Sequence, residues 1–447
     1  MLRTIRSNYL LRFYNHCPLR KCLRTFLSES YSCAEVWNRR YKSPLLSKVN
    51  PRNLYFELEQ NFQRTGKISA VDVDIFINTI KDPEFVDEVI NILHRLRLSA
   101  ETGKTLESTH HALIRYLLDS KNEDLLLEVL HDRLNYGIFP DHYSYNLLMN
   151  QFIKEKKFAS AAKVAALLML QEDSENNLCN ALGIYSCYKF LENPNDWILP
   201  APPVPDPNEE VVKVRVLYLR NPFFDDHFDL TEPKHLVGKS LVFFGKLHND
   251  PLGRTCQLRG YILWSKYEKA VKLIKSWIDD GVNEIIYKEA VPVIEKELSE
   301  INEDEITDDV KELKLQFEKL KGLSLKDGSV IDEMEKRLYD AVKQTEAIEI
   351  NNQCEVFENW EKNRMNLLEK QLDELDKKRR LENAEKIKRD LQERERLLTF
   401  FDHEEEIELQ IEQKLAAEEA EFGPVIEVSA ENEENYIPPE VNKSVQK

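Results

Sequence analysis

The sequence predicts an all-α protein in which a short helical-repeat superhelix is followed by a long charged C-terminal helical hairpin or coiled coil. Two observations lead to this fold class. Apolar residues between positions 73 and 170 recur at helical spacing with a period of about 35 residues, the class of period that marks stacked helical hairpins. The stretch from Ser329 to Phe422 contains neither Gly nor Pro and is dense in charge, as in a long exposed helix.

The repeat is clearest in its third copy, where apolar side chains at i, i+3, i+4, i+7 and i+8 mark one face of a helix. These residues are Tyr145, Leu148, Met149, Phe152 and Ile153. The same positions 35 residues earlier hold His110, Leu113, Ile114, Leu117 and Leu118, and 37 residues before those they hold Val73, Phe76, Ile77 and Ile80. One hairpin cannot bury its apolar stripe alone, so we expect about three units to stack. Helix pairs of another all-α fold would give the same periodicity.

A proline-rich segment, residues 193–210, follows the repeats and contains six prolines. Because helix interiors exclude proline, we expect an extended linker and a domain boundary there. Alternating apolar and polar residues favour a strand at 211–220. Residues 235–247 and 257–280 return to helical spacing, which predicts a second helical region.

The C-terminal part is expected to form long helices. Gly322 and Gly328 bracket a turn, so the helix of residues 308–321 should fold back on the one that begins near Val330. Nineteen of the 28 residues from 369 to 396 are charged with mixed sign, which favours i to i+4 pairs along an exposed helix. A short coiled-coil seam could form from Phe357, Trp360, Leu367, Leu368, Leu372 and Leu375.

Charge is distributed unevenly along this chain of net charge -18. Residues 1–28 carry six basic residues and no acid, whereas residues 291–447 carry 24 basic against 43 acidic residues. Arginines spaced among apolar residues, without the apolar run of a secretory signal, indicate a mitochondrial presequence; a basic arm is the alternative. The predicted organisation is a presequence (1–28), helical repeats (29–192), a Pro-rich linker (193–210), a second helical region (211–300), a long helical hairpin or coiled coil (305–422) and an acidic disordered tail (423–447).

No constellation of residues indicates catalysis or a cofactor. The seven cysteines are scattered without a CxxC pair, so we interpret them as reduced thiols with no zinc site. Gly238-Lys239-Ser240 lacks the first turn of a phosphate-binding loop, and residues 225–229 lack the spacing of a metal loop. We therefore expect no enzyme, no cofactor, no metal and no small-molecule substrate. No run of about 18 apolar residues occurs, so no membrane partner is expected either.

Two sets of residues are candidates for RNA binding. Asp74, His111 and Asn146 each follow the first core position of their repeat, so they should form a polar column along the edge of the groove, where repeat proteins read bases. Ordinary surface polarity is the alternative. The second set consists of lysines that could contact phosphates, in an inter-helix turn and along one helix. They are Lys154, Lys156, Lys157, Lys266, Lys269, Lys272 and Lys275.

Residues 136–165, YGIFPDHYSYNLLMNQFIKEKKFASAAKVA, resemble a pentatricopeptide repeat. The turn G-x-x-P-D runs from Gly137 to Asp141, the Y-N opening is Tyr145 and Asn146, and the central alanine is Ala161 or Ala162. More narrowly, the chain is similar to the pentatricopeptide-type family numbered twenty-seven in the small subunit of the animal mitochondrial ribosome, through its YGIFPD and NLLM segments, arginine-rich start and charged C-terminal helix. The proline-rich linker departs from that family.

The resemblance implies an RNA-binding component of the mitochondrial small ribosomal subunit. Such a protein would lie in the mitochondrial matrix, contact small-subunit rRNA and neighbouring ribosomal proteins, and support mitochondrial translation, with tRNA or mRNA as further candidate partners. Because the other repeats lack the Y-N opening, shape and phosphate contacts are expected rather than a base code. Two alternatives remain open: a free organellar RNA-processing or translation factor, and a coiled-coil protein adaptor that binds no RNA.

Overall fold

The all-α prediction is confirmed by the computed structural model, which describes residues 26–198, 224–301, 308–399 and 401–422. The chain divides into two units, residues 1–367 and 368–447, and the division falls within one helix. We describe each unit by itself. The strand predicted at residues 211–220 lies outside the described residues, as do residues 199–210 of the Pro-rich linker and the whole predicted acidic tail.

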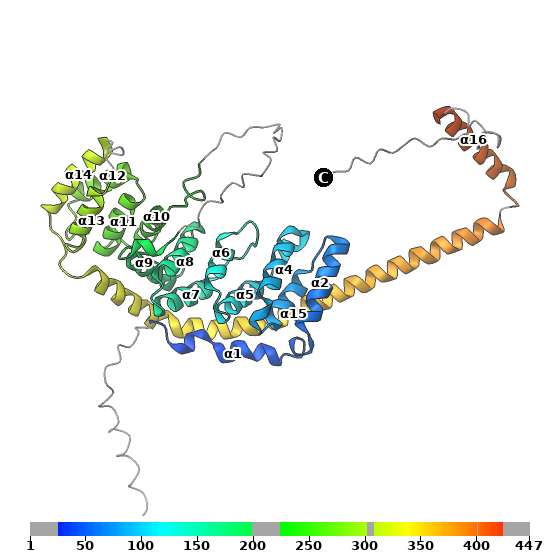
Figure 1. Ribbon diagram of the computed structural model, residues 1–447, viewed down its shortest axis with the longest axis horizontal. Coiled ribbons are helices and arrows are strands. Elements are labelled where there is room, and N and C mark those ends of the chain that lie inside the picture. The colour runs from blue at the N-terminus through cyan, green and yellow to red at the C-terminus, as the bar shows by residue number, and fades with distance from the viewer. Residues whose placement is uncertain (1–25, 199–223, 302–307, 400, 423–447) are drawn as a thin grey trace, which may run out of the picture. The chain divides into compact units, whose positions relative to one another are not determined.

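The described residues form sixteen α-helices (Figure 1). They are α1 (Ala34–Asn38), α2 (Pro51–Thr65), α3 (Ala70–Thr79), α4 (Val86–Leu98), α5 (Glu107–Asp119), α6 (Glu123–His131), α7 (His142–Lys154), α8 (Phe158–Leu170), α9 (Asn177–Phe190), α10 (Pro233–Gly245), α11 (Pro251–Leu263), α12 (Tyr267–Asp279), α13 (Ala290–Ser299), α14 (Asp308–Lys321), α15 (Val330–Leu398) and α16 (Glu404–Phe422).

Helices α3 to α14 form a stack of consecutive pairs. The first helices of neighbouring pairs pack on one another, as α3 does on α5, α7 on α9 and α11 on α13. The second helices form a parallel layer through the contacts of α6 with α8, α8 with α10 and α12 with α14. Apolar residues from both layers join one continuous core, which is how stacked hairpins bury stripes that a single hairpin would expose.

A shared turn identifies the repeating unit in the backbone. In three pairs, the second residue after the first helix has a positive φ. These residues are Lys121 (59°), Lys156 (62°) and Ser265 (56°). The next backbone N–H donates to the carbonyl five residues earlier, as from Lys157 to Phe152 (2.8 Å) and from Lys266 to Tyr261 (3.0 Å). This is the Schellman type of helix end. The helix predicted over 257–280 is therefore wrong, because the chain turns there and forms a repeat from α11 and α12.

The Pro-rich segment interrupts a helix pair rather than separating two domains. Helix α9 precedes it and α10 follows it, yet α10 packs against α9, α8 and α11. Both sides belong to the same unit. The domain boundary predicted at 193–210 is thus incorrect, because proline excludes a helix locally without preventing the flanking helices from pairing.

Two glycines explain why α10 and α11 approach each other closely. A Cβ atom on Gly260 would lie 2.5 Å from the carbonyl oxygen of Gly238, and one on Gly238 would lie 2.8 Å from the carbonyl oxygen of Gly260. The two backbones are in direct contact at this point. The Gly238-Lys239-Ser240 sequence therefore serves helix packing, in agreement with its missing phosphate-loop turn.

The helix of residues 308–321 was expected to fold back on the following helix, but it packs against a different one. Helix α14 packs against α12 and completes the stack of pairs. The residues of α15 up to Leu367 instead leave the turn after Gly328, whose φ is 126°, and run along the first helices of the array (Figure 1). In the part of the chain that the structure describes, no helix is both long enough and apolar enough to span a bilayer.

Candidate functional site

The predicted polar column lies on the side of the array formed by the first helices α3, α5 and α7, which we call the inner face. The residues of α15 up to Leu367 pass along this face, and the N-terminal segment, residues 26–42, lies beside them (Figure 1). The inner face is therefore covered by two other parts of the same chain. Its contacts are described below from α3 to α7.

Asp74 of α3 is fully buried and forms an ion pair with Arg364 of α15. The Arg364 Nε atom donates to Asp74 Oδ2 at 2.5 Å, and the two side chains are 0% and 4% exposed. The other carboxylate oxygen accepts from Ser108 Oγ (2.5 Å) and Thr109 Oγ1 (2.8 Å) of α5. A buried charge is tolerated only when it is paired and hydrogen-bonded, and this carboxylate meets both conditions.

His111 of α5 lies in an aromatic cluster contributed by three segments. Its ring centroid is 4.8 Å from Trp37 of α1, 5.3 Å from Phe357 and 5.4 Å from Trp360 of α15. Burial, with the nearby Arg115 as the next cause, lowers the pKa of His111 well below its usual value, so the ring is neutral at pH 7. The ring nitrogens are both used: Nε2 accepts from Arg115 Nε (3.3 Å) and Nδ1 donates to the Ser144 hydroxyl (3.0 Å).

Asn146 of α7 contacts a carboxylate of α15. Its Nδ2 donates to Glu349 Oε2 at 3.3 Å and to the Tyr31 hydroxyl at 3.1 Å. Tyr31 in turn donates to Glu349 Oε2 (2.6 Å), and Asn176 at the start of α9 donates to Glu349 Oε1 (2.7 Å). Burial and then the Glu349 charge raise the pKa of Tyr31, so its hydroxyl remains a donor.

The three contacts follow the repeat along α15. Arg364 and Glu349 are fifteen residues apart, and the pair of Phe357 and Trp360 lies between them. At about 1.5 Å per residue, the fifteen residues span about 22 Å, or about 11 Å for each of the two steps between repeats. One column residue per repeat therefore meets α15 about every two helical turns.

The column prediction was wrong about exposure. Asp74, His111 and Asn146 share one direction, but they are 0%, 1% and 0% exposed. Their contact with RNA stays a prediction, and in this conformation α15 and the N-terminal segment cover them. The periodic pattern of one helix cannot reveal a distant partner, and Phe357 and Trp360 were instead expected in a coiled-coil seam. Leu372 and Leu375 of that seam are 54% and 56% exposed.

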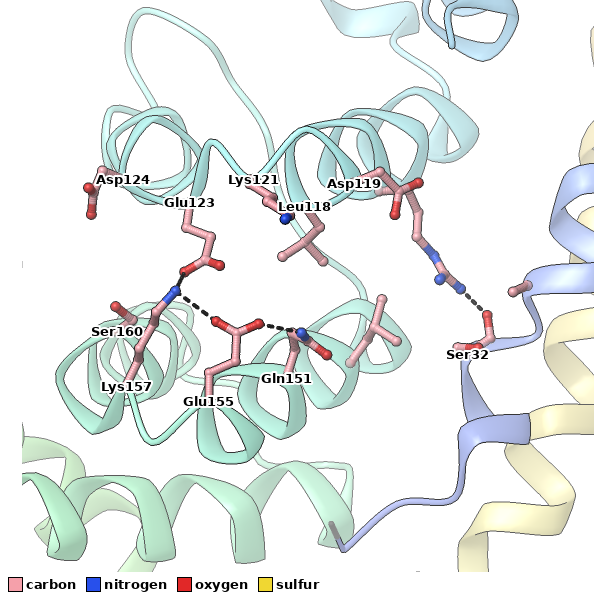
Figure 2. A pocket seen from close by; sticks show the side chains of 13 residues that line it. Ser32, Leu118, Asp119, Lys121, Glu123, Asp124, Gln151, Glu155, Lys157 and Ser160 are labelled. Carbon is pink, nitrogen blue, oxygen red and sulfur yellow. Dashed lines mark hydrogen bonds and ion pairs between the residues drawn. The ribbon is translucent and has the colours of Figure 1, made fainter. Parts of the chain in front are cut away.

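Of the three predicted turn lysines, Lys157 lines a surface cavity of about 820 Å³ between the second and third pairs (Figure 2). Lys157 Nζ lies 2.6 Å from Glu123 Oε2 and 2.7 Å from Glu155 Oε2, and these hydrogen bonds, Glu123 first, raise the pKa of Lys157. Lys154 and Lys156 form no ion pair within the described ranges. The cavity is lined by the acids Asp119, Glu123, Asp124 and Glu155 and the bases Arg115, Lys121 and Lys157. This balance does not favour an anion.

The predicted lysine stripe lies on and just before α12, and most of it is already paired. Lys266 pairs with Asp226 (2.9 Å), Lys272 with Glu268 (2.5 Å) and Lys275 with Glu312 (2.5 Å). Lys269 is exposed, with its ammonium 5.2 Å from the centre of the Trp264 ring. Asp226 also accepts from Trp264 Nε1 (3.3 Å), so this loop acid stabilises the protein's own turn. No metal-binding group of three or more ligands occurs among the described residues.

The second unit presents a different surface. Every residue from 372 to 398 of α15 is exposed. Four consecutive basic residues occur there, Lys377, Lys378, Arg379 and Arg380, among acids such as Glu382, with which Lys378 pairs at 3.9 Å. All four of these basic residues are exposed.

The described chain begins inside the predicted presequence. Phe26 and Leu27 are 6% and 2% exposed, and the Phe26 ring lies 5.0 Å from Tyr185 of α9. Leu27 N donates to Asn150 Oδ1 of α7 (3.3 Å). A presequence ending at residue 28 would remove these core residues, so that boundary conflicts with the packing. The first 25 residues lie outside the described part.

The stacked helix pairs and their shared Schellman turns define a helical-repeat protein. The family model described as "Mitochondrial 28S ribosomal protein S27" matches residues 1–390, and the chain belongs to that family. The chain is also 25% identical over 183 residues to the pentatricopeptide repeat-containing protein 2, mitochondrial, of Xenopus laevis. That match covers 40% of this chain and about half, 47%, of the relative. The predicted family and the mitochondrial location, in the mitochondrial ribosome, are thereby confirmed.

Proposed function

We propose that this chain is a structural component of the mitochondrial small ribosomal subunit that contacts rRNA and neighbouring ribosomal proteins, supports mitochondrial translation and catalyses no reaction. The covered inner face is the observation that decides how the chain would contact RNA. A repeat protein that reads bases needs this face free, whereas here Asp74 and Asn146 are bound by Arg364 and Glu349. RNA contact would therefore use other surfaces, through phosphates rather than base edges.

The proposed contacts are lysines without an ion-pair partner and the exposed basic run of α15. Lys154, Lys156 and Lys269 have no ion-pair partner in the described ranges, and the run from Lys377 to Arg380 is exposed. Lys157, Lys266, Lys272 and Lys275 would have to leave their acidic partners before contacting a phosphate. Since exposed ion pairs contribute only about 0–1 kcal/mol, that exchange is feasible but less favourable than use of the unpaired lysines.

The packing of Phe26 changes the proposed end of the presequence. Arginine spacing still supports import into mitochondria, but removal of Phe26 and Leu27 would leave a cavity beside Tyr185. We therefore propose processing before Phe26. Amino-terminal sequencing of the mature protein tests this: a start at or before residue 26 agrees with it, and a start at residue 29 contradicts it.

Sedimentation tests the assignment to the subunit. Mitochondrial lysate would be separated on sucrose gradients at moderate and high salt and probed for the protein beside a small-subunit protein and its rRNA. Migration with the subunit that survives high salt supports the proposal. Migration only in light fractions contradicts it and would leave a free RNA factor or a protein adaptor.

Crosslinking then locates RNA contact on the assembled protein. Ultraviolet crosslinking followed by peptide mapping should identify peptides with the unpaired lysines or residues 377–380, and should omit peptides centred on Asp74 and Asn146. Crosslinks concentrated at the inner face would contradict the proposal of phosphate contact. Absence of RNA crosslinks from a protein that still sediments with the subunit would favour an adaptor that binds proteins alone, a role that the exposed helix of residues 372–398 also suits.

A further inference from the structure

Two cysteines from distant parts of the sequence face each other where the N-terminal segment lies beside α15. Cys33 immediately precedes α1, and Cys354 lies on α15 one turn before Phe357. Both are free thiols, and Cys354 adds to the effect of burial in raising the pKa of Cys33. Cys33 is buried and Cys354 is partly exposed, so one member of the pair is reachable from solvent.

The contacts on either side fix the register of this pair. The Ser28 backbone N–H donates to Glu346 Oε1 (2.8 Å), and the Tyr31 hydroxyl donates to Glu349 Oε2 (2.6 Å). Further along both segments, the rings of Trp37 and Phe357 lie 5.1 Å apart. Cys33 lies between Tyr31 and Trp37, and Cys354 lies between Glu349 and Phe357. The two segments thus run in the same direction and hold the thiols opposite each other.

We propose that Cys33 and Cys354 are a peroxide-sensitive pair whose oxidation to a disulfide fastens the N-terminal segment to α15 over the inner face. Hydrogen peroxide is the oxidant. The Cys354 thiolate attacks one peroxide oxygen, forming an S–O bond and breaking the O–O bond; the released hydroxide takes up the thiol proton as water. The Cys33 sulfur then attacks the sulfenic sulfur, forming the S–S bond and releasing a second water that carries the Cys33 proton. Two thiols lose two electrons and one peroxide gains them.

The environment supports this order of steps. Cys354 is partly exposed and can meet peroxide, whereas burial raises the pKa of the Cys33 thiol and makes it a poor first nucleophile. Cys33 is suited to the second step, since its partner is already beside it. The remaining described cysteines Cys179, Cys187 and Cys256 are at most 1% exposed, so peroxide in solution does not reach them in the folded chain.

Peptide mapping of the oxidised full-length chain tests the proposal. The chain would be treated with hydrogen peroxide, quenched with catalase, alkylated under denaturing conditions and digested without reductant. We expect a linked peptide pair containing Cys33 and Cys354, reversed by dithiothreitol, while Cys187 and Cys256 are recovered alkylated. The C33S and C354S variants should each lose the linked pair while retaining the helical circular dichroism of the natural chain.

Three outcomes would overturn the proposal. In one, Cys354 accumulates as sulfinic acid while Cys33 is recovered alkylated, which means that Cys33 does not resolve the sulfenic acid. In another, Cys354 links two chains, seen as a dimer on a non-reducing gel. In the last, both thiols stay reduced at peroxide concentrations that oxidise a control surface thiol. Because C354S alters a partly exposed position, it keeps the test valid if C33S does not fold.

Discussion

The two parts of α15 share one continuous backbone and differ in what surrounds them. Up to Leu367 the helix inserts Trp360, Arg364 and Phe357 into the core of the repeat array, whereas every residue from 372 to 398 is exposed. Charge alone does not distinguish the two parts, since Arg364 and Arg389 are the same residue type on the same helix. Position relative to the inner face decides which charge is structural and which is available to a partner.

The largest expected effect comes from breaking the buried ion pair. Arg364→Ala leaves the Asp74 carboxylate buried without its cation, which should lower the free energy of unfolding by about 3–5 kcal/mol. Urea unfolding followed by circular dichroism measures the change. The matched control is Arg389→Ala in the exposed part, where we expect a change within about 0.5 kcal/mol.

A double-mutant cycle sharpens this test. If the pair acts as a unit, Asp74→Asn combined with Arg364→Met should be less damaging than the sum of the two single changes, because no uncompensated charge remains. Equal losses for Arg364→Ala and Arg389→Ala would show that the two parts of α15 do not differ as described.

The next largest effect is a dependence of stability on pH, which arises from the buried His110 of α5. Burial lowers the pKa of His110 to about 4, against the attraction of Glu107 and Asp74, so the unfolded chain binds a proton near pH 6.5 that the folded chain does not accept until about pH 4. The stabilisation is complete above about pH 6.5 and is lost as pH falls towards 4. The His110 shift corresponds to about 3–4 kcal/mol.

Urea titrations at pH 7, 6 and 5 check this dependence. His110→Gln should reduce the loss of stability between pH 7 and pH 5, because the glutamine side chain takes up no proton. An unchanged slope in His110→Gln would assign the pH dependence to other groups. His403, which is 59% exposed beside Glu406 in the second unit, provides the control substitution and should leave the slope unchanged.

A smaller effect is expected at Glu349. Glu349→Gln preserves the shape of the side chain but removes the charge that accepts from Tyr31 and Asn176, which should cost about 1–2 kcal/mol. Thermal unfolding measures it, with Glu369→Gln in the exposed part as a control of near-zero effect. Equal melting temperatures for the two variants would mean that Glu349 does not hold α15 on the inner face.

The smallest effect on stability, and the largest on assembly, is expected in the second unit. Exchange of Lys377, Lys378, Arg379 and Arg380 for glutamine should leave the unfolding free energy nearly unchanged, because exposed charges contribute little. If these residues contact phosphates, the variant should leave the small subunit at lower salt on a sucrose gradient. Retention at the salt concentration of the natural chain would remove this run from the proposed contacts.

The sequence predicted what is local and periodic. The 35-residue period placed Val73, Leu113 and Leu148 in the core, and all three are fully buried. It missed the repeat formed by α11 and α12, because Ser265 adopts the left-handed turn conformation that glycine more often occupies, so helical spacing looked continuous. It also read prolines as a domain boundary, since sequence shows where a helix is excluded and not which helices pair afterwards.

The site depends on contacts between residues far apart in the chain, and these left no signal in one sequence. Asp74 and Arg364 are separated by 290 residues, and Tyr31 and Glu349 by 318. The polar column was recognisable because its members share a register within the repeats. The column is buried because α15 covers it. From the sequence alone, Phe357 and Trp360 of α15 fit a coiled-coil seam equally well, since the sequence does not show which residues they contact.

Hydrogen–deuterium exchange along α15 tests the central claim most directly, namely that the inner face is occupied by the chain's own helix. In the full-length protein, amides from about residue 349 to 364 should exchange only through large-scale unfolding, whereas those from 372 to 396 should exchange through local opening, at least about a hundredfold faster. Added RNA should not change protection at the inner face. Fast exchange throughout α15, or loss of protection at residues 349–364 when RNA is added, would contradict the account.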